Sequence, residues 1–368
     1  MTLFYLSPIN WDSIKQRPHY FVNWLHKRTL EKVIWIDPYP TRLPNIKDLK
    51  RFSSSSNDFQ KNDVPEWIKI KKNKALPIEP INLINYLNNP IWNSLIKELK
   101  QNSSKEDSLI IGKPSKFALI IIKKLNFKIK IYDAMDDFPY FYNGLSFISQ
   151  QKNLKKLLDK VDIITTSSIN LSNEYQQRNL KTLYIKNGGD FSNLPKINLK
   201  RNKKRLCFGY IGTIAKWFDW EWIKAIGEIA YTSRIKLIGP LYVDIPNNLP
   251  SNIEIYPPVN NKNCLEIMND FSIGLIPFKI NQLTENVDPI KFYEYKALGL
   301  PVISTNFGSM RYKNNEKGLY VSHSYEDINL LIEKALNYKI DQNDLKKFIK
   351  DNSWDNLFDK SNLLKEII

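Results

Sequence analysis

The chain has 368 residues, 42% of them hydrophobic, and this length favours two domains over a single core. No apolar run approaches the ~18 residues of a membrane-spanning helix, and residues 1–6 are too short and lack the basic region of a secretory signal peptide. We therefore expect a cytosolic protein whose first residues form a strand. Cys207 and Cys264 belong to no CxxC motif or Cys/His cluster, so no metal site is predicted.

The net charge of +16 is unevenly distributed along the chain. Residues 1–200 contain 32 Lys and Arg against 18 Asp and Glu, whereas residues 201–368 contain 22 against 20. A basic half suits two kinds of partner, nucleic acid and an anionic membrane. Because this half is also rich in Asn and Ile, a bias in composition is a third explanation for the excess of lysine.

The first half alternates short apolar runs with helical patterns, which predicts a parallel sheet covered on both faces. We expect strands at residues 2–6, 32–36, 108–111, 128–132, 162–166 and 182–185, and helices at 18–27, 116–125 and 168–178. Residues 53–63 are polar and are predicted to form a mobile loop.

Acidic and basic residues stand where this first domain should bind ligands. Asp133, Asp136 and Asp137 follow an apolar strand, and the carboxyl ends of parallel strands are where ligands bind. Repulsion among these carboxylates could raise the pKa of one of them and leave a usable base. A solvated acidic loop or a helix cap is the alternative. Arg17 and His19 open the first helix, and His19 is the best placed of three histidines for base chemistry.

Residues 188–205 break the pattern with Pro, Asn and a basic cluster, so they are predicted to link two domains. A second series follows, with strands at 206–211, 234–238, 253–256 and 272–276, and helices at 220–230 and 262–268. Residues 325–337 and 354–367 are predicted to be closing helices. The predicted domains are therefore 1–187 and 206–350, with residues 351–368 as a terminal helix.

Residues 286–305 predict a loop, a helix and a strand with an anion site. Pro289 suits the first turn of a helix, whose exposed N–H groups and partial positive charge attract an anion. Lys291 lies in that turn, where the helix dipole disfavours a cation, and an external diphosphate would resolve the conflict. Glu294 lies one turn on, on the same face. An ordinary amphipathic helix with a solvated Lys and Glu explains the spacing equally well.

A second anion-binding element is predicted after the strand at 206–211. Gly212 and Thr213 form a turn in which the backbone can approach a diphosphate closely, and Lys216 follows. Taken alone, these residues are also typical of an ordinary turn.

The ordered set of these motifs resembles GT-B glycosyltransferases close to family 4, especially the enzymes of teichuronic acid and exopolysaccharide synthesis. The resemblance covers about residues 1–335 and includes Gln16-Arg17-Pro18-His19, Tyr132-Asp133-Ala134-Met135-Asp136-Asp137, Asn187-Gly188-Gly189-Asp190 and Gly209-Tyr210-Ile211-Gly212-Thr213. It implies an α/β protein with two Rossmann-like, doubly wound domains facing a central cleft, the first binding an acceptor and the second a nucleotide-sugar donor. In such folds the last helix crosses back to the first domain.

The resemblance also implies roles for single residues. The donor-binding residues would be Gly212, Thr213, Lys216, Asn286, Lys291, Phe292 and Glu294. Asp136 or Asp137 would face the acceptor hydroxyl, His19 would be the next candidate base, and Arg17 would contact phosphate or a sugar acid. The family's Glu-x7-Glu pair is incomplete because Asn286 stands where the first acid is expected, which puts the transferred sugar in doubt.

The function implied is transfer of a sugar from a UDP- or GDP-linked donor to a lipid-linked or oligosaccharide acceptor in bacterial surface polysaccharide synthesis. We expect it to need no metal, since there is no Asp-x-Asp motif, and to retain the anomeric configuration, with inversion through an Asp136 base left open. No other cofactor is expected, and the enzyme is expected to lie peripherally on the inner face of the plasma membrane. The alternatives are a GT-B-fold sugar-nucleotide epimerase and a basic nucleic-acid-binding protein, although no nucleic-acid-binding motif is present.

Overall fold

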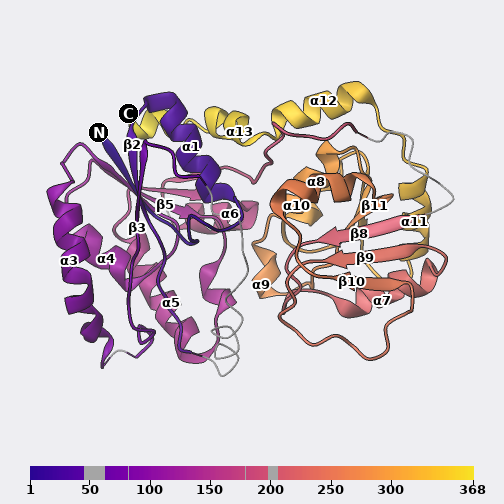
Figure 1. Ribbon diagram of the computed structural model, residues 1–368, viewed down its shortest axis with the longest axis horizontal. Coiled ribbons are helices and arrows are strands. Elements are labelled where there is room, and N and C mark those ends of the chain that lie inside the picture. The colour runs from indigo at the N-terminus through magenta and orange to yellow at the C-terminus, as the bar shows by residue number, and fades with distance from the viewer. Residues whose placement is uncertain (45–62, 82, 179, 198–205) are drawn as a thin grey trace. The chain divides into compact units, whose positions relative to one another are not determined.

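The computed structural model describes the chain apart from residues 45–62, 82, 179 and 198–205. The chain forms two compact α/β units, called unit 1 and unit 2 below (Figure 1). Unit 1 comprises Met1–Ile185 with Phe358–Ile368, and unit 2 comprises Lys186–Leu357. The loop predicted at 53–63 lies outside the described residues except for Asp63, as do residues 198–205 of the predicted linker.

Unit 1 is built on a parallel seven-stranded sheet with the order β3-β2-β1-β4-β5-β6-β7. Its strands are β1 (Thr2–Leu6), β2 (Lys32–Ile36), β3 (Ile68–Lys71), β4 (Ser108–Ile111), β5 (Ile129–Ala134), β6 (Ile163–Thr166) and β7 (Thr182–Tyr184). The chain runs outward from β1 to β3 and then returns to β4 on the other side. The strand order therefore reverses between β1 and β4, and ligands of doubly wound sheets bind beside such a reversal.

Helices cover both faces of this sheet because successive strand residues point to opposite sides. Tyr5 meets Phe21 of α1 (Arg17–Thr29) on one face, with ring centroids 5.9 Å apart. Phe4 belongs to the core on the other face, together with buried residues of α3 (Asn88–Gln101), α4 (Lys116–Lys124) and α5 (Gly144–Leu158). Unit 1 also contains η1 (Asn85–Leu87), η2 (Phe138–Phe141) and α6 (Ile169–Gln177).

Unit 2 repeats this plan with six parallel strands in the order β10-β9-β8-β11-β12-β13. They are β8 (Cys207–Ile211), β9 (Arg234–Ile238), β10 (Ile253–Tyr256), β11 (Ile273–Ile276), β12 (Val302–Thr305) and β13 (Leu319–Ser322). Tyr210 joins a core with α7 (Trp220–Ile229) and α11 (Ile328–Leu336), whereas Ile211 joins a core with α8 (Asn261–Asn269) and α10 (Ile290–Ala297). Here the strand order reverses between β8 and β11.

The C-terminal segment predicted as one helix is two helices, α13 (Trp354–Lys360) and α14 (Leu363–Ile367). Asn362 separates them in the left-handed conformation (φ 59°), which Asn adopts more readily than most residues. From Phe358 onward this segment belongs to unit 1, where Asp359 accepts hydrogen bonds from Trp24 (2.8 Å) and Arg28 (2.6 and 2.9 Å). It follows α12 (Gln342–Asp351), which is part of unit 2.

Candidate functional site

In unit 2 the predicted anion-binding helix is α10, which begins at Ile290. Pro289, predicted in the first turn, is instead the residue just before it, with extended backbone (φ −74°, ψ 120°). The N–H groups of a first helical turn have no partner within the helix, so this end of α10 presents donors and partial positive charge.

Tyr295 fixes α10 against the end of β8. Its hydroxyl accepts a hydrogen bond from the backbone N–H of Ile211 (3.1 Å), the last residue of that strand. The ring has room because residue 274 is glycine: a Cβ there would lie 2.5 Å from the ring. The helix and the turn that follows β8 are thereby held in one rigid part of unit 2.

That turn contains Gly212 and Thr213, and it is packed against the turn after β9. The N–H of Gly212 donates to the carbonyl of Ile238 (2.9 Å). A Cβ on Gly239, whose φ is +147°, would lie 2.1 Å from the carbonyl oxygen of Gly212. Only glycine permits so close an approach of two backbones. Thr213 is half-buried, and its carbonyl accepts a hydrogen bond from the hydroxyl of Tyr210 (2.9 Å). Lys216 is exposed, and partial desolvation lowers its pKa.

The sequence predicts that Lys291 and Glu294 lie on one face of α10 near an anion, and in the structure they contact each other. Their side chains form an ion pair of 2.5 Å between Nζ and Oε2, and they are 25% and 21% exposed. The unfavourable position of Lys291 in the helix dipole is therefore compensated by Glu294 within the same helix. An incoming anion would compete with Glu294 for the ammonium group, so this pair is accessible to a ligand but already satisfied.

Two other predicted donor-site residues are buried in unit 2. Phe292 is 1% exposed and packs edge to face against Tyr293 (5.2 Å) and Phe348 (6.0 Å), so its side chain belongs to the core and only its backbone can meet a ligand. Asn286 is 8% exposed and ends the short helix α9 (Gln282–Glu285).

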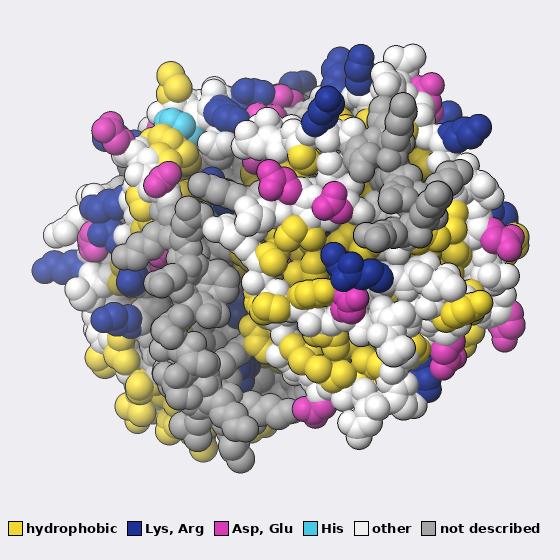
Figure 2. All heavy atoms as spheres, turned by 45° about the vertical axis from the view of Figure 1, so that its right-hand side comes forward, with side chains coloured by type: hydrophobic (Ala, Val, Ile, Leu, Met, Phe, Trp, Pro, Cys, Tyr) yellow, Lys and Arg dark blue, Asp and Glu magenta, His cyan; other side chains and the backbone are white. Residues whose placement is uncertain are grey.

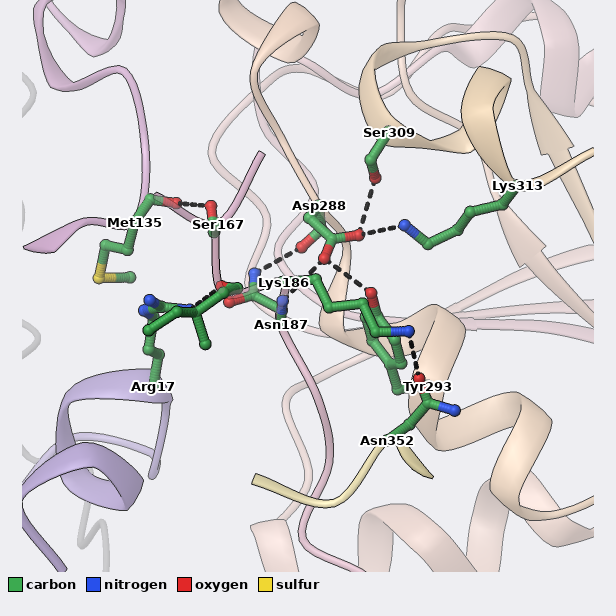
Figure 3. A network of polar contacts seen from close by, with 11 residues as sticks. Arg17, Met135, Ser167, Lys186, Asn187, Asp288, Tyr293, Ser309, Lys313 and Asn352 are labelled. Carbon is green, nitrogen blue, oxygen red and sulfur yellow. Dashed lines mark hydrogen bonds and ion pairs between the residues drawn. The ribbon is translucent and has the colours of Figure 1, made fainter. Parts of the chain in front are cut away.

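Asp288 holds the loop between α9 and α10, a role that the sequence analysis missed (Figure 3). Its carboxylate accepts hydrogen bonds from the N–H of Asn187 (2.8 Å), the hydroxyls of Tyr293 (2.7 Å) and Ser309 (2.7 Å), and the ammonium of Lys313 (2.9 Å). It is 3% exposed. Asn187 belongs to the Asn-Gly-Gly-Asp motif, so this contact joins two of the sequence motifs within unit 2.

In unit 1, Asp136 and Asp137 follow β5 and are both half-buried. The pKa of Asp136 is raised to about 7: desolvation is the largest cause, Arg17 opposes it, and the nearby carboxylates of Asp137 and Asp133 add to the rise. A carboxyl group with this pKa can exchange a proton near neutral pH. The carbonyl of Asp137 accepts a hydrogen bond from the N–H of Tyr140 (3.1 Å) in η2.

The structure corrects the prediction for Arg17. Its side chain is fully buried and forms an ion pair with Asp133, also fully buried, with Nη2 2.9 Å from Oδ1 and Nε 3.0 Å from Oδ1. Nη1 donates to the carbonyl of Ile185 (2.6 Å; Figure 3). A guanidinium enclosed in this way holds β5 and the residue after β7 to α1, and it does not reach a phosphate or a sugar acid.

His19 is also corrected, because it is 3% exposed and both ring nitrogens are engaged. Nδ1 accepts a hydrogen bond from the N–H of Gln16 (3.2 Å), and Nε2 lies 3.0 Å from the carbonyl of Trp11, to which it donates. The ring packs between Trp11 and Trp35, and desolvation lowers its pKa to about 4. His19 is a neutral structural residue in this conformation.

Across the described part of the chain, no three His, Cys, Asp or Glu side chains are grouped as a metal site.

Comparison with solved structures shows that the chain has the GT-B fold. Sucrose-phosphate synthase from Thermosynechococcus elongatus aligns with a TM-score of 0.71 at 11% identity, over 100% of this chain and 98% of that one. A trehalose-6-phosphate structure from E. coli bound with UDP-2-fluoro glucose gives 0.62 at 13% over 100% of both chains. HepE of Anabaena in complex with UDP gives 0.60 at 12% over 99% of both.

Among curated proteins, the chain is similar to "Putative teichuronic acid biosynthesis glycosyltransferase TuaH" of Bacillus subtilis (strain 168). The two are 24% identical over 205 residues, which are 49% of this chain and 51% of the relative. The chain thus spans about half the length of the curated relative that it matches. No protein-family model matches the sequence.

Proposed function

We propose that this protein is a glycosyltransferase that takes its sugar from a nucleoside diphosphate sugar. The observation that carries the proposal is that Tyr295 ties together the two elements predicted to bind phosphate, α10 and the turn at Gly212 that packs against Gly239. Both lie beside the reversal of strand order between β8 and β11. The similarity to TuaH and the UDP-bound neighbours with the same fold support it.

In this proposal, the N-terminus of α10 and Lys291 stabilise the leaving diphosphate. Glu294 gives up its ion pair with Lys291, and its carboxylate then accepts hydrogen bonds from the ribose hydroxyls of the donor. The C–O bond between the anomeric carbon and the diphosphate breaks as the acceptor oxygen attacks that carbon, and the acceptor proton passes to an oxygen of the departing diphosphate, or to Asp136 if the product is inverted. Fixed N–H donors and a cation stabilise the charge that develops on the diphosphate without requiring a metal. Full activity in excess EDTA is therefore expected, and loss of activity that Mn²⁺ restores would contradict this part.

The product is proposed to retain the anomeric configuration, as the resemblance to family 4 implies. Asp136 would then bind the acceptor hydroxyl. If the product is inverted, Asp136 takes the acceptor proton directly in a single displacement, because its pKa near 7 suits a base. NMR of the first product formed distinguishes the two outcomes by the coupling constant of its anomeric proton.

The acceptor is proposed to be a lipid-linked or oligosaccharide intermediate of surface polysaccharide synthesis, used at the inner face of the plasma membrane. No helix of the described residues is long and apolar enough to cross a membrane. Unit 1 instead exposes what we call the apolar–basic face: Leu83, Tyr86, Leu87, Ile91, Leu145, Ile148, Lys152 and Lys155. Leu145, Ile148, Lys152 and Lys155 belong to α5 and recur at helical spacing, so they share one side of that helix.

Hydrogen bonds of the buried Glu79 connect the two segments that carry these residues. Glu79 accepts from Asn153 of α5 (2.8 Å), and its carbonyl accepts from Asn85 of η1 (3.5 Å). An apolar surface bordered by lysines suits an anionic bilayer, because each Lys near the membrane surface adds about 1 kcal/mol to the free energy of binding. On the face shown in Figure 2, by comparison, Lys and Arg side chains are dispersed among Asp and Glu, not gathered into a basic stripe such as nucleic acid requires.

The experiment that tests the donor assignment is a thermal-shift panel with UDP, GDP, dTDP and CMP. A ligand present at 100 times its Kd adds about 2.7 kcal/mol of stability. One diphosphate is expected to raise the Tm clearly above the others, and its sugar conjugates then become the donors for transfer assays. No shift with any nucleotide would contradict the proposal. Conversion of the donor to an epimer without any acceptor would assign the protein to the epimerases instead.

A further inference from the structure

Asp288 connects three segments of unit 2 around the loop that leads into α10 (Figure 3). Its Oδ2 accepts hydrogen bonds from the backbone N–H of Asn187 (2.8 Å) and the hydroxyl of Tyr293 (2.7 Å). Its Oδ1 accepts from the hydroxyl of Ser309 (2.7 Å) and the ammonium of Lys313 (2.9 Å). Each oxygen therefore has two donors, which is the usual capacity of a carboxylate. Because the side chain is also fully buried, it acts only through these partners.

The same loop is packed directly against η3 (Gly308–Lys313). The N–H of Ser309 donates to the carbonyl of Val287 (3.2 Å). Gly308 has a φ of +41°, and a Cβ on it would lie 2.4 Å from the carbonyl oxygen of Thr284 and 2.7 Å from that of Val287. Only glycine permits this approach, so η3 is a close support for the backbone of the loop.

Asn187 is the second support of the loop. Its N–H donates to Oδ2 of Asp288, and its side-chain Nδ2 donates to the backbone carbonyl of Asp288 (2.7 Å). Two bonds between the same residues fix orientation as well as distance, because hydrogen bonds weaken when either partner rotates. Tyr293, one turn into α10, reaches back to the residue that precedes the helix start by two positions. The path of the chain into α10 is thereby fixed.

The contact with Lys313 is a buried ion pair, in which the side chains of Asp288 and Lys313 are 0% and 10% exposed. The ammonium also lies over the rings of Phe292 (5.7 Å) and Tyr293 (5.6 Å) of α10. Removing both charges from water offsets most of their attraction, so such a pair adds little stability compared with apolar side chains of similar size. It does specify geometry, because its hydrogen bonds are all satisfied in one arrangement of the three segments.

We propose that Asp288 is a positioning residue for the diphosphate of the donor: it holds the first turn of α10 where the N–H groups of that turn meet the phosphates. The inference rests on the proposed function, because it takes α10 to be the diphosphate site. Fixed N–H donors stabilise an anion better than mobile ones, since they need no reordering when the ligand arrives. Loss of the contacts of Asp288 should therefore reduce the contribution of the phosphates to affinity and leave recognition of the nucleoside unchanged.

The test is calorimetric titration of the full chain with UDP and GDP, with uridine and guanosine measured by displacement. The wild type is expected to bind the diphosphate of its preferred base about tenfold or more tightly than the nucleoside. In Asp288→Asn the amide NH₂ must face either the N–H of Asn187 or the ammonium of Lys313, neither of which accepts a hydrogen bond. This variant should lose the preference for the diphosphate and keep the affinity for the nucleoside.

The double variant Asp288→Asn/Lys313→Met should rescue the site. Its amide oxygen can face Asn187 and Tyr293 while the NH₂ group donates to Ser309, so the geometry is rebuilt without either buried charge. The preference for the diphosphate should return. Absence of recovery in a double variant with the Tm of the wild type would overturn the proposal.

Trp222→Phe is the matched control for stability. It removes a buried hydrogen bond from Nε1 to Oγ of Ser322 (3.2 Å), in the core on the α7 side of the sheet. This variant should have a lower Tm and an unchanged preference for the diphosphate. Ser309→Ala removes one contact of Asp288 and keeps both charges paired, so it serves if Asp288→Asn does not fold; its preference should fall about threefold or more. Equal loss of preference in Trp222→Phe, or none in the variants at positions 288 and 309, would overturn the proposal.

The wild-type titration separates this inference from the proposed function. If the wild type binds UDP and GDP no more tightly than the nucleosides, α10 is not a diphosphate site and both fail. If the wild type prefers the diphosphate and Asp288→Asn keeps that preference, only the role of Asp288 fails.

Discussion

At the scale of one residue, desolvation raises the pKa of Asp136 into the range that suits acid–base catalysis. A carboxyl group whose pKa is raised to about 7 binds its proton more tightly in the folded chain than in the unfolded one. Its protonated form stabilises the fold, and that stability is lost as the pH rises from about 4 to about 7. A catalytic base, in contrast, must be ionised. Raising the pH should therefore increase the activity that depends on Asp136 and decrease the stability that this residue contributes.

Asp136→Asn should therefore lower kcat by about 100-fold or more while nucleotide affinity persists. In the wild type, kcat/KM should fall as the pH drops below about 7. The variant should also gain stability over the wild type at pH 8 but not at pH 4, as measured by urea unfolding at both values. Asp137→Asn is the neighbouring comparison, and near-full turnover in both variants would place the base elsewhere.

His19 should titrate in the other direction. Its pKa of about 4 lies below the usual 6.5, so the unfolded chain binds the proton more tightly and stability falls as the pH drops from 6.5 to 4. The difference corresponds to about 3 kcal/mol. His19→Gln should flatten this part of the profile of unfolding free energy against pH and leave the pH dependence of kcat unchanged. A changed kcat profile would restore His19 as a catalytic candidate.

At the scale of elements, α10 owes its position to the hydroxyl of Tyr295. Tyr295→Phe leaves the N–H of Ile211 buried without its partner, which costs about 1–3 kcal/mol and frees the helix from the Gly212 turn. We expect a lower Tm and weaker nucleotide binding together. Tyr320→Phe is the matched control, since its hydroxyl donates a hydrogen bond to the carbonyl of Lys334 near the surface (3.1 Å). Equal nucleotide affinity in Tyr295→Phe and the wild type would show that α10 does not serve the ligand.

The sequence predicted strands well where apolar runs were bounded by turn residues, and β1, β2, β4, β9 and β10 have the expected bounds. It missed β3, β13, α3, α5 and α12. The strand β3 reads Ile-Lys-Ile-Lys, an edge strand with polar exposure, and α5 contains Gln150 and Asn153, polar residues that are nonetheless buried. Such elements are defined by their neighbours in space, which periodicity along the chain does not reveal.

The same limit applies to the candidate site. The spacing of Lys291 and Glu294 was enough to place them on one face of a helix, and glycine at position 212 was enough to predict a close turn. The burial of Arg17 could not be predicted, because its partner Asp133 lies 116 residues away. Asp288 lies within the motif at residues 286–305, but its role could not be predicted because its partners Asn187, Ser309 and Lys313 are 21 or more residues away in the sequence.

At the scale of the whole molecule, the uneven charge and the apolar–basic face predict reversible binding to an anionic bilayer. Flotation with liposomes of increasing anionic lipid should show binding that high salt reverses. The double variant Leu145→Ser/Ile148→Ser should bind more weakly, and Leu330→Ser, an equally exposed leucine on α11 in unit 2, should not. Equal partition to neutral and anionic liposomes would mean that the excess lysine is only a bias of composition.

The central claim is that α10 and the Gly212 turn bind the diphosphate of a sugar donor, and calorimetric titration of UDP and GDP tests it most directly. Loss of a charge-assisted hydrogen bond costs roughly 1.5–3 kcal/mol, so Glu294→Ala and Lys291→Ala should each weaken binding by about 10- to 150-fold without unfolding the chain. Glu333→Ala, an exposed glutamate on α11, should bind as the wild type does. Unchanged affinity for both nucleotides in both α10 variants would contradict the account.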